Sequence, residues 1–170
     1  YEKKDGKVIG KLAKKNVDTG SGLERVVMMV QGKNNVFDTD LFLPIMNKIA
    51  ELSGAAPSNI RALRIVSDHM RTSVMMIADG VRPSNTDQGY ILRRLLRRAV
   101  RYADVLGVPH GKLSELVTVV ARIYEGVYDN VSNQAEVIER EIAEEEAKFR
   151  KTLEHGMGEF RNYIRSGSFH

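Results

Sequence analysis

Apolar residues recur every three or four positions along most of this chain of 170 residues, and that spacing is typical of amphipathic helices. From Asp38 onward we expect only helices. The first of them would start at one of three N-cap candidates, Asp38, Thr39 or Asp40, and would be closed by Gly54. Its apolar stripe consists of Phe42, Ile45, Met46, Ile49 and Leu52.

Two long helices are expected next, one ending at Gly80 and one running from Tyr90 to Leu106. A polar loop rich in Pro, Ser and Asn, residues 81–89, joins them. The predicted inner face of the earlier helix holds Ala62, Ile65, Val66, His69, Ser73, Met76 and Ile77.

The last third of the chain predicts two more helices. One would cover Lys112 to Tyr128, with apolar positions at Leu113, Leu116, Val117, Val120 and Val127. The sequence Asn133-x-x-Glu136 is typical of a capping box and would open the final helix. The stripe of that helix consists of Ile138, Ile142, Phe149, Leu153, Met157, Phe160 and Ile164.

The N-terminal region lacks this periodicity. Residues 1–9 predict a β-hairpin that turns at Asp5-Gly6, and residues 22–31 predict a short helix that ends at Gly32. A polar linker follows, so we place a domain boundary between residues 35 and 36. The predicted fold class is mainly α: a multi-helix domain over residues 36–170, preceded in residues 1–35 by a short β-hairpin and one short helix.

Composition removes several kinds of chemistry. The chain has no cysteine, which excludes disulfides, cysteine–zinc sites and thiol catalysis. Its four histidines are scattered, and His69 is expected to be a packed, hydrogen-bonded side chain, so we predict no metal site. Without a bilayer-length apolar run or an export leader, we expect a cytoplasmic chain with no membrane partner.

Charge is distributed unevenly although the net charge is only +4. Residues 61–101 hold nine arginines against three aspartates, whereas residues 136–146 hold six glutamates and one arginine. Five arginines fall within an arc of about 140° on the helix predicted from Tyr90; they are Arg93, Arg94, Arg97, Arg98 and Arg101. Such a stripe matches a nucleic-acid phosphate backbone. Alternatively, some of these arginines pair with the acidic last helix.

A second candidate site is Asp18-Thr-Gly-Ser-Gly-Leu-Glu-Arg25, which runs into an apolar helix. Gly20 and Gly22 let the backbone approach a ligand closely, and a helix N-terminus offers unpaired N–H groups to an anion. Arg25 adds a planar set of donors suited to phosphate. These features indicate a nucleotide-phosphate site. The alternative is an ordinary glycine turn with a surface arginine.

Several segments, in this order, resemble the alanyl-tRNA synthetases, which are class II aminoacyl-tRNA synthetases. They are Asp18 to Arg25, which resembles motif 3 of that family, then Asp38-Thr-Asp-Leu-Phe42, Asp68-His-Met-Arg71, Ile77-Ala-Asp-Gly80, Pro83-Ser-Asn85 and Gln88 to Arg101. The resemblance implies that residues 1–35 are the end of a class II catalytic domain and that residues 36–170 are a helical tRNA-recognition domain. It also implies an enzyme that forms alanyl-adenylate from ATP, with Mg, and alanine, and transfers alanine to tRNA-Ala.

The resemblance assigns roles to single residues. Arg25 would be catalytic and bind ATP together with Gly20 and Gly22, while Asp18 and Gly20 would bind alanine, Asp18 through its amino group. Asn85 would face the G·U wobble pair of the tRNA acceptor stem, and the five arginines of the stripe would bind the stem. From the residues alone, Asp18 could also be a helix cap, and Asn85 could also be a turn residue that caps the next helix.

Of the three class II motifs the chain shows the third alone, so we expect a fragment that does not activate alanine by itself. Two other functions remain open: a non-catalytic RNA-binding helical module, and a structural helical domain whose arginines bind partner proteins.

Overall fold

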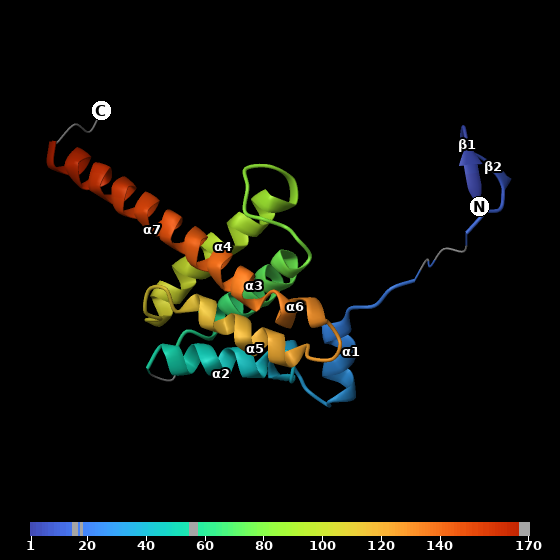
Figure 1. Cartoon of the computed structure of the whole chain (residues 1–170), viewed down its shortest axis with the longest axis horizontal. Coiled ribbons are helices and arrows are strands. Elements are labelled where there is room, and N and C mark those ends of the chain that lie inside the picture. Colours follow the sequence, from blue (N-terminus) through green and yellow to red (C-terminus); the bar gives the residue numbers. More distant parts are fainter. Residues whose placement is uncertain (15–16, 18, 55–57, 167–170) are drawn as a thin grey trace.

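The computed structural model describes residues 1–14, 17, 19–54 and 58–166. In these residues the chain forms a body of packed helices, with a small hairpin at the N-terminal end and a long helix that projects at the other (Figure 1). The prediction of a mainly α fold with an N-terminal hairpin is confirmed. Among the described residues, no helix is both long and apolar enough to cross a membrane.

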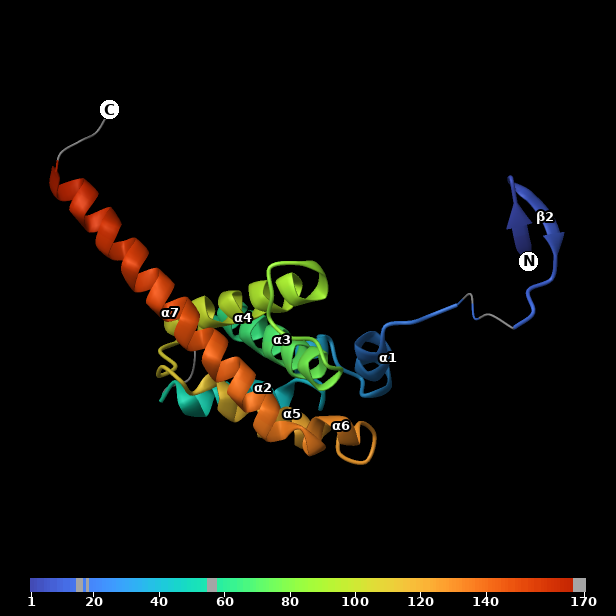
Figure 2. The same ribbon diagram turned by 45° about the horizontal axis from the view of Figure 1, so that its top comes forward.

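The hairpin pairs β1 (Glu2–Lys4) with β2 (Lys7–Gly10) in antiparallel fashion. Its turn is the predicted Asp5-Gly6, where both residues have positive φ, +50° and +77°. Asp-Gly favours this turn because Gly, and to a lesser degree Asp, tolerates the left-handed region. In both views the hairpin lies apart from the helices (Figures 1 and 2).

Helix α1 (Leu23–Val30) ends before Gly32, as predicted. The N-caps predicted at residues 38–40 are wrong, because a 3-10 turn, η1 (Val36–Asp38), occupies this segment and α2 (Leu43–Leu52) begins later. The Asn35 side chain caps η1 by accepting from the Phe37 N–H at 2.9 Å. Local side-chain bonds of this kind compete with helix formation. The α2 stripe is buried as expected, apart from the half-buried Leu52.

Helices α3 (Ile60–Ala78) and α4 (Asp87–Leu106) pack side by side in the centre of the body (Figure 2). The buried face of α3 includes Ala62, Val66, His69, Ser73 and Ile77, as predicted, together with Leu63, Met70 and Val74. The prediction was less accurate for Ile65 and Met76, which are half-buried. Helix α4 starts three residues before the predicted Tyr90, and it ends at Gly107, whose φ is +75°.

The single helix predicted over residues 112–128 is wrong. This segment forms η2 (Leu113–Glu115) and α5 (Leu116–Ile123), and α6 (Asp129–Asn133) follows separately. Gly126 adopts a φ of +74°, which ends any continuous helix there, and the Val127 side chain is 71% exposed. Helical periodicity alone overlooked the conformational freedom of this glycine.

The last helix, α7 (Ala135–Ser166), packs on the body with its N-terminal half and projects beyond it with its C-terminal half (Figure 2). The capping box predicted at Asn133 is wrong, because Asn133 is the last residue of α6. Ile138 and Ile142 lie in the core, and Phe149 and Leu153 are half-buried. The remainder of the predicted stripe, Met157, Phe160 and Ile164, is exposed.

Candidate functional site

The arginines of α4 divide into two groups according to their neighbours. Arg94, Arg98 and Arg101 are exposed, and in the described part of the chain no carboxylate forms an ion pair with them. Together with Arg97 they line a groove of about 580 Å³ between α4 and α7. The groove is completed by Tyr102, Val105 and Phe149.

Arg93 and Arg97 form the second group, and both lie against Glu145 of α7. Arg97 Nε donates to Glu145 Oε1 at 2.8 Å. Arg93 Nε lies 3.4 Å from the same oxygen, close enough for an ion pair but not aligned for a hydrogen bond. The alternative that some of the stripe pairs with the acidic last helix is therefore confirmed for these two residues.

Aromatic rings lie beside the arginines of the groove. The Arg97 guanidinium carbon is 5.2 Å from the centre of the Phe149 ring, and that of Arg98 is 5.8 Å from the centre of the Tyr102 ring. Contacts of this kind restrict a flexible cation without neutralising it. The groove thus presents fixed positive charge next to flat apolar surface, a combination suited to nucleic acid.

The loop before α4 carries Asn85, which is exposed and accepts a hydrogen bond at Oδ1 from Arg93 Nη1. Ser84 holds this loop in shape: its N–H donates to the Gly89 carbonyl at 3.1 Å, and its hydroxyl donates to the Thr86 carbonyl at 2.9 Å. The hydrogen bond from Arg93 thus links Asn85 of the loop to the arginine stripe on α4.

Two buried residues that contact this loop and these arginines, Gly89 and Glu145, were not singled out by the sequence. A Cβ at Gly89 would overlap Ser84 Oγ and the Arg82 carbonyl oxygen, so the loop can lie this close only against glycine. Glu145 is 3% exposed. The run of glutamates in the sequence did not indicate that Glu145 is buried, because this burial depends on α4, some fifty positions away along the chain.

Residues 19–25 hold most of the predicted nucleotide-phosphate site, which lies at the start of α1 and apart from the α4–α7 groove. Gly22 occupies the N-cap position of α1, and neither Gly20 nor Gly22 has a positive φ. Within the described residues a Cβ at Gly20 would meet nothing within 4 Å, and one at Gly22 would meet only the Arg25 side chain. Asp18 lies outside the described residues.

Helix α1 is joined to the helical body through the residue next to Arg25. Glu24 accepts a hydrogen bond from Arg71 of α3, whose guanidinium also covers the Phe42 ring at 4.4 Å. The hydrogen bond from Arg71 is the main reason that the pKa of Glu24 lies below its ordinary value. This ion pair crosses the predicted boundary at residues 35 and 36.

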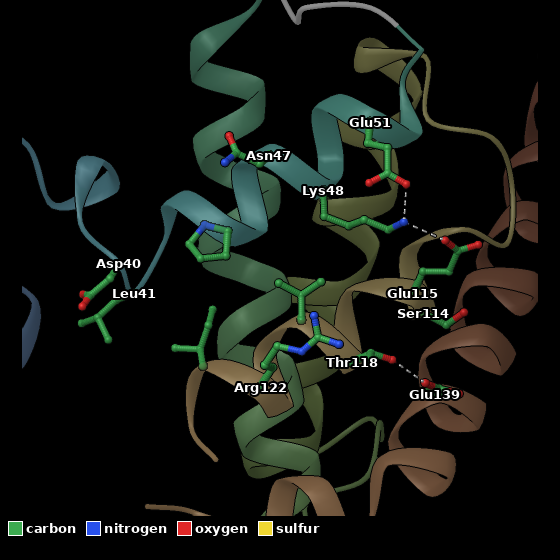
Figure 3. A pocket seen from close by; sticks show the side chains of 13 residues that line it. Asp40, Leu41, Asn47, Lys48, Glu51, Ser114, Glu115, Thr118, Arg122 and Glu139 are labelled. Atoms are coloured by element: carbon green, nitrogen blue, oxygen red, sulfur yellow. Dashed lines mark hydrogen bonds and ion pairs between the residues drawn. The ribbon is translucent and has the colours of Figure 1, made fainter. Parts of the chain in front are cut away.

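A larger groove of about 900 Å³ runs between α2 and α5, and Figure 3 shows its side chains. Lys48 of α2 lies between Glu51 and Glu115, at 2.7 and 3.4 Å. The lining carries four carboxylates, Asp40, Glu51, Glu115 and Glu139, against the cations Lys48 and Arg122. That balance makes it a poor site for a polyanion.

His69 is buried and its Nδ1 lies 2.9 Å from an Asp68 carboxylate oxygen, as expected of a packed histidine. Across the described ranges, no three histidine, aspartate or glutamate side chains gather in a way that could hold a metal ion.

Comparison with known proteins bears on the whole chain. A family model described as tRNA synthetases class II (A) matches residues 1–168. The alanine–tRNA ligase of Desulfitobacterium hafniense is 41% identical over 160 residues, which are 92% of this chain and 18% of that protein. Those of Borreliella afzelii and Elusimicrobium minutum are 42% and 43% identical over 98% and 97% of this chain, and over 29% and 19% of their own lengths. The resemblance drawn from the motifs is confirmed, and the chain spans less than a third of these relatives.

Proposed function

The chain belongs to the class II (A) family of tRNA synthetases, and from this premise we propose that it is part of an alanine–tRNA ligase and binds the tRNA acceptor stem. The observation that carries the proposal is the groove between α4 and α7, where three exposed arginines have no carboxylate partner among the described residues. In this proposal Arg94, Arg98 and Arg101 bind phosphates of the stem.

Asn85 is the proposed reader of sequence. The deep major groove of an RNA helix excludes side chains, whereas its shallow minor groove exposes base edges and 2′-hydroxyl groups. An exposed asparagine at the edge of a cationic surface can reach those groups while the arginines hold the backbone. We assign to Asn85 the recognition of the G·U wobble pair that the family resemblance implies, with Arg93 and Arg97 beside it on the same surface.

The region before the helical domain has a separate proposed role in the complete enzyme. Arg25 binds the phosphates of ATP, which arrives with Mg, and Gly20 and Gly22 shape the adjoining floor. Asp18, together with Gly20, binds alanine. Formation of an aminoacyl adenylate is an in-line attack on a phosphate, so positive charge aids it more than covalent chemistry does. The parent enzyme is proposed to act in the cytoplasm.

The test is fluorescence anisotropy of the chain with two acceptor-stem hairpins that differ in one pair, G·U or G·C, across a salt series. We expect affinity to fall steeply with salt for both stems, because phosphate contacts release counterions. The G·U stem should bind more tightly, by about fivefold or more, which is the low end for one good contact to a base. Asn85→Ala should remove that preference and leave the salt dependence unchanged.

Equal, salt-dependent binding to both stems would favour a non-catalytic RNA-binding module without specificity, and absence of binding would exclude both RNA proposals. For the chemistry, alanine-dependent ATP–pyrophosphate exchange by this chain alone is expected to be undetectable. Measurable exchange would contradict the proposal that the chain holds only part of the catalytic site.

A further inference from the structure

We propose that Glu145, a buried carboxylate on α7, is a positioning residue that orients Asn85 through Arg93. The inference rests on the proposed function, since it concerns how the same surface distinguishes one stem from another. The proposal gives α7 a role in distinguishing one stem from another, although the segments that resemble the synthetases end at Arg101, before this helix.

The environment of Glu145 sets it apart from its neighbours. Glu144 has a side chain that is 53% exposed and pairs with Lys148 of its own helix. Glu146 is as buried as Glu145, but it accepts from the Gly111 N–H at 3.0 Å and from Arg150 at 2.8 Å, contacts that fix the loop before η2. Of these three described glutamates, only Glu145 forms ion pairs with arginines of α4. Burying a carboxylate is costly unless it is paired. The two ion pairs with Glu145 therefore hold Arg93 and Arg97 close to it.

Arg93 transmits this constraint to the loop. Its Nε lies 3.4 Å from Glu145 Oε1, while its Nη1 donates to Asn85 Oδ1. The guanidinium is a rigid plane, so an ion pair that holds its Nε edge near α7 also restricts the direction of its Nη1 edge. Glu145, Arg93 and Asn85 therefore form one connected series of polar contacts from α7 to the loop.

The series also determines which end of the Asn85 amide is presented. Arginine has no acceptor, so it must face the amide oxygen, and the amide nitrogen remains as the donor. No described residue accepts from that nitrogen. Asn85 is thereby prepared to donate to an acceptor on a base edge or to a 2′-hydroxyl oxygen.

Loss of the carboxylate should have two opposite effects. Arg93 and Arg97 would no longer be neutralised, so both could bind phosphate and non-specific affinity should rise. At the same time the Asn85 amide would lose its fixed direction, and preference between stems should fall. A residue that only stabilised the fold would lower binding to both stems together.

The experiment compares Glu145→Gln with Glu144→Gln, which removes the same charge one position away on the same helix. For Glu145→Gln we expect affinity for the G·C stem to rise by about 2- to 10-fold, with a salt slope steeper by about one to two. The preference for G·U should drop to within about twofold of unity. Glu144→Gln should keep the wild-type preference.

Arg93→Lys is a second variant that keeps the charge but cannot bridge the two partners. It should lose the preference while retaining the wild-type salt slope, and it tests the inference even if Glu145→Gln folds poorly. In the RNA-free chain, the side-chain amide resonances of Asn85 should shift in Glu145→Gln and stay in place in Glu144→Gln.

If wild type prefers G·U and both Glu145→Gln and Arg93→Lys keep that preference, the inference is overturned while the proposed function stands. If wild type itself binds both stems equally, the proposed reading of the G·U pair by Asn85 fails, and the inference fails with it.

Discussion

The two regions of the chain hold their candidate ligand-binding side chains in different ways. In the helical region the five candidate arginines lie on α4, whose opposite face is packed in the core at Leu92 and Leu96, 0% and 2% exposed. By contrast, α1 has no fully buried residue. In the described structure it is tied to the body by the Glu24–Arg71 pair and by a 3.3 Å bond from the Asp40 N–H to Gln31.

The geometry of the two candidate sites therefore has different sources. The α4–α7 surface is fixed by a hydrophobic core that the described residues build among themselves, so its shape and charge should persist without a ligand. Arg25 is instead exposed on a helix without a fully buried residue, next to the ion-paired Glu24. We therefore expect the helical region to bind its ligand autonomously and the N-terminal region to need its context in the complete enzyme.

The largest expected difference between the regions is in stability. Leu96→Ala should lower the free energy of unfolding by about 2–5 kcal/mol, because it leaves a cavity under α4. Met29→Ala on α1, where the side chain is 76% exposed, should change it by no more than about 0.5 kcal/mol. Urea unfolding followed by circular dichroism measures both. Equal losses would mean that α1 is as much part of the core as α4.

The next largest effect concerns RNA affinity. The double variant Arg94→Glu, Arg98→Glu should weaken binding of either stem by about 100-fold and lower the salt slope by about two, one for each lost phosphate contact. Arg122→Glu with Arg140→Glu makes the same charge change at exposed positions outside the α4–α7 groove. A comparable loss in this control would show that overall charge, rather than the surface on α4, drives binding.

Two glycine substitutions compare how tightly the backbone is packed in the two regions. Gly89→Ala should destabilise the fold by about 1–2 kcal/mol, since overlap with Ser84 and the Arg82 carbonyl outweighs the better helix propensity of alanine. Gly20→Ala should be within about 0.5 kcal/mol of wild type, because the new Cβ meets nothing in the described structure. Thermal unfolding checks both, and a Gly89→Ala chain as stable as wild type would contradict the packing of the loop.

The smallest effect is the pH dependence of the contact between the regions. Arg71 lowers the pKa of Glu24, so the ion pair stabilises the fold above the unfolded value of 4.5, and this contribution is lost as pH falls through the lower folded pKa. Glu24→Gln should cost about 0.2–1 kcal/mol at pH 7, the range for partly exposed pairs, and almost nothing at the acidic end. Glu125→Gln, at an exposed glutamate, serves as control. If the loss of unfolding free energy in Glu24→Gln does not shrink on acidification, the Glu24–Arg71 ion pair is not its source.

The sequence predicted what local chemistry determines. The Asp5-Gly6 turn and the end of α4 at Gly107 follow from residues that tolerate positive φ, and both were predicted correctly. The prediction of one helix over residues 112–128 was wrong because Gly126 also adopts a positive φ. The pattern of apolar residues concealed the effect of this glycine. The start of α2 was misplaced because the capping by Asn35 belongs to a short 3-10 turn that has no periodic signal.

The candidate site was predictable in its residue types and unpredictable in its pairing. Helical geometry placed the five arginines on one face, but only tertiary structure separates Arg93 and Arg97 from the exposed three. The separation is made by Glu145, which is one of six glutamates in a run that looks uniform in the sequence. The roles of Arg25, Gly20 and Asp18 stay predictions that require the complete enzyme.

The most direct test of the central claim, that the helical region binds RNA through the α4–α7 surface, is a map of amide chemical-shift changes on adding the G·U stem to the isotope-labelled chain. We predict that the largest changes cluster at residues 84–101 and 145–149, with α1 and the acidic groove between α2 and α5 unaffected. Changes concentrated on the N-terminal hairpin or along the α2–α5 groove would contradict it.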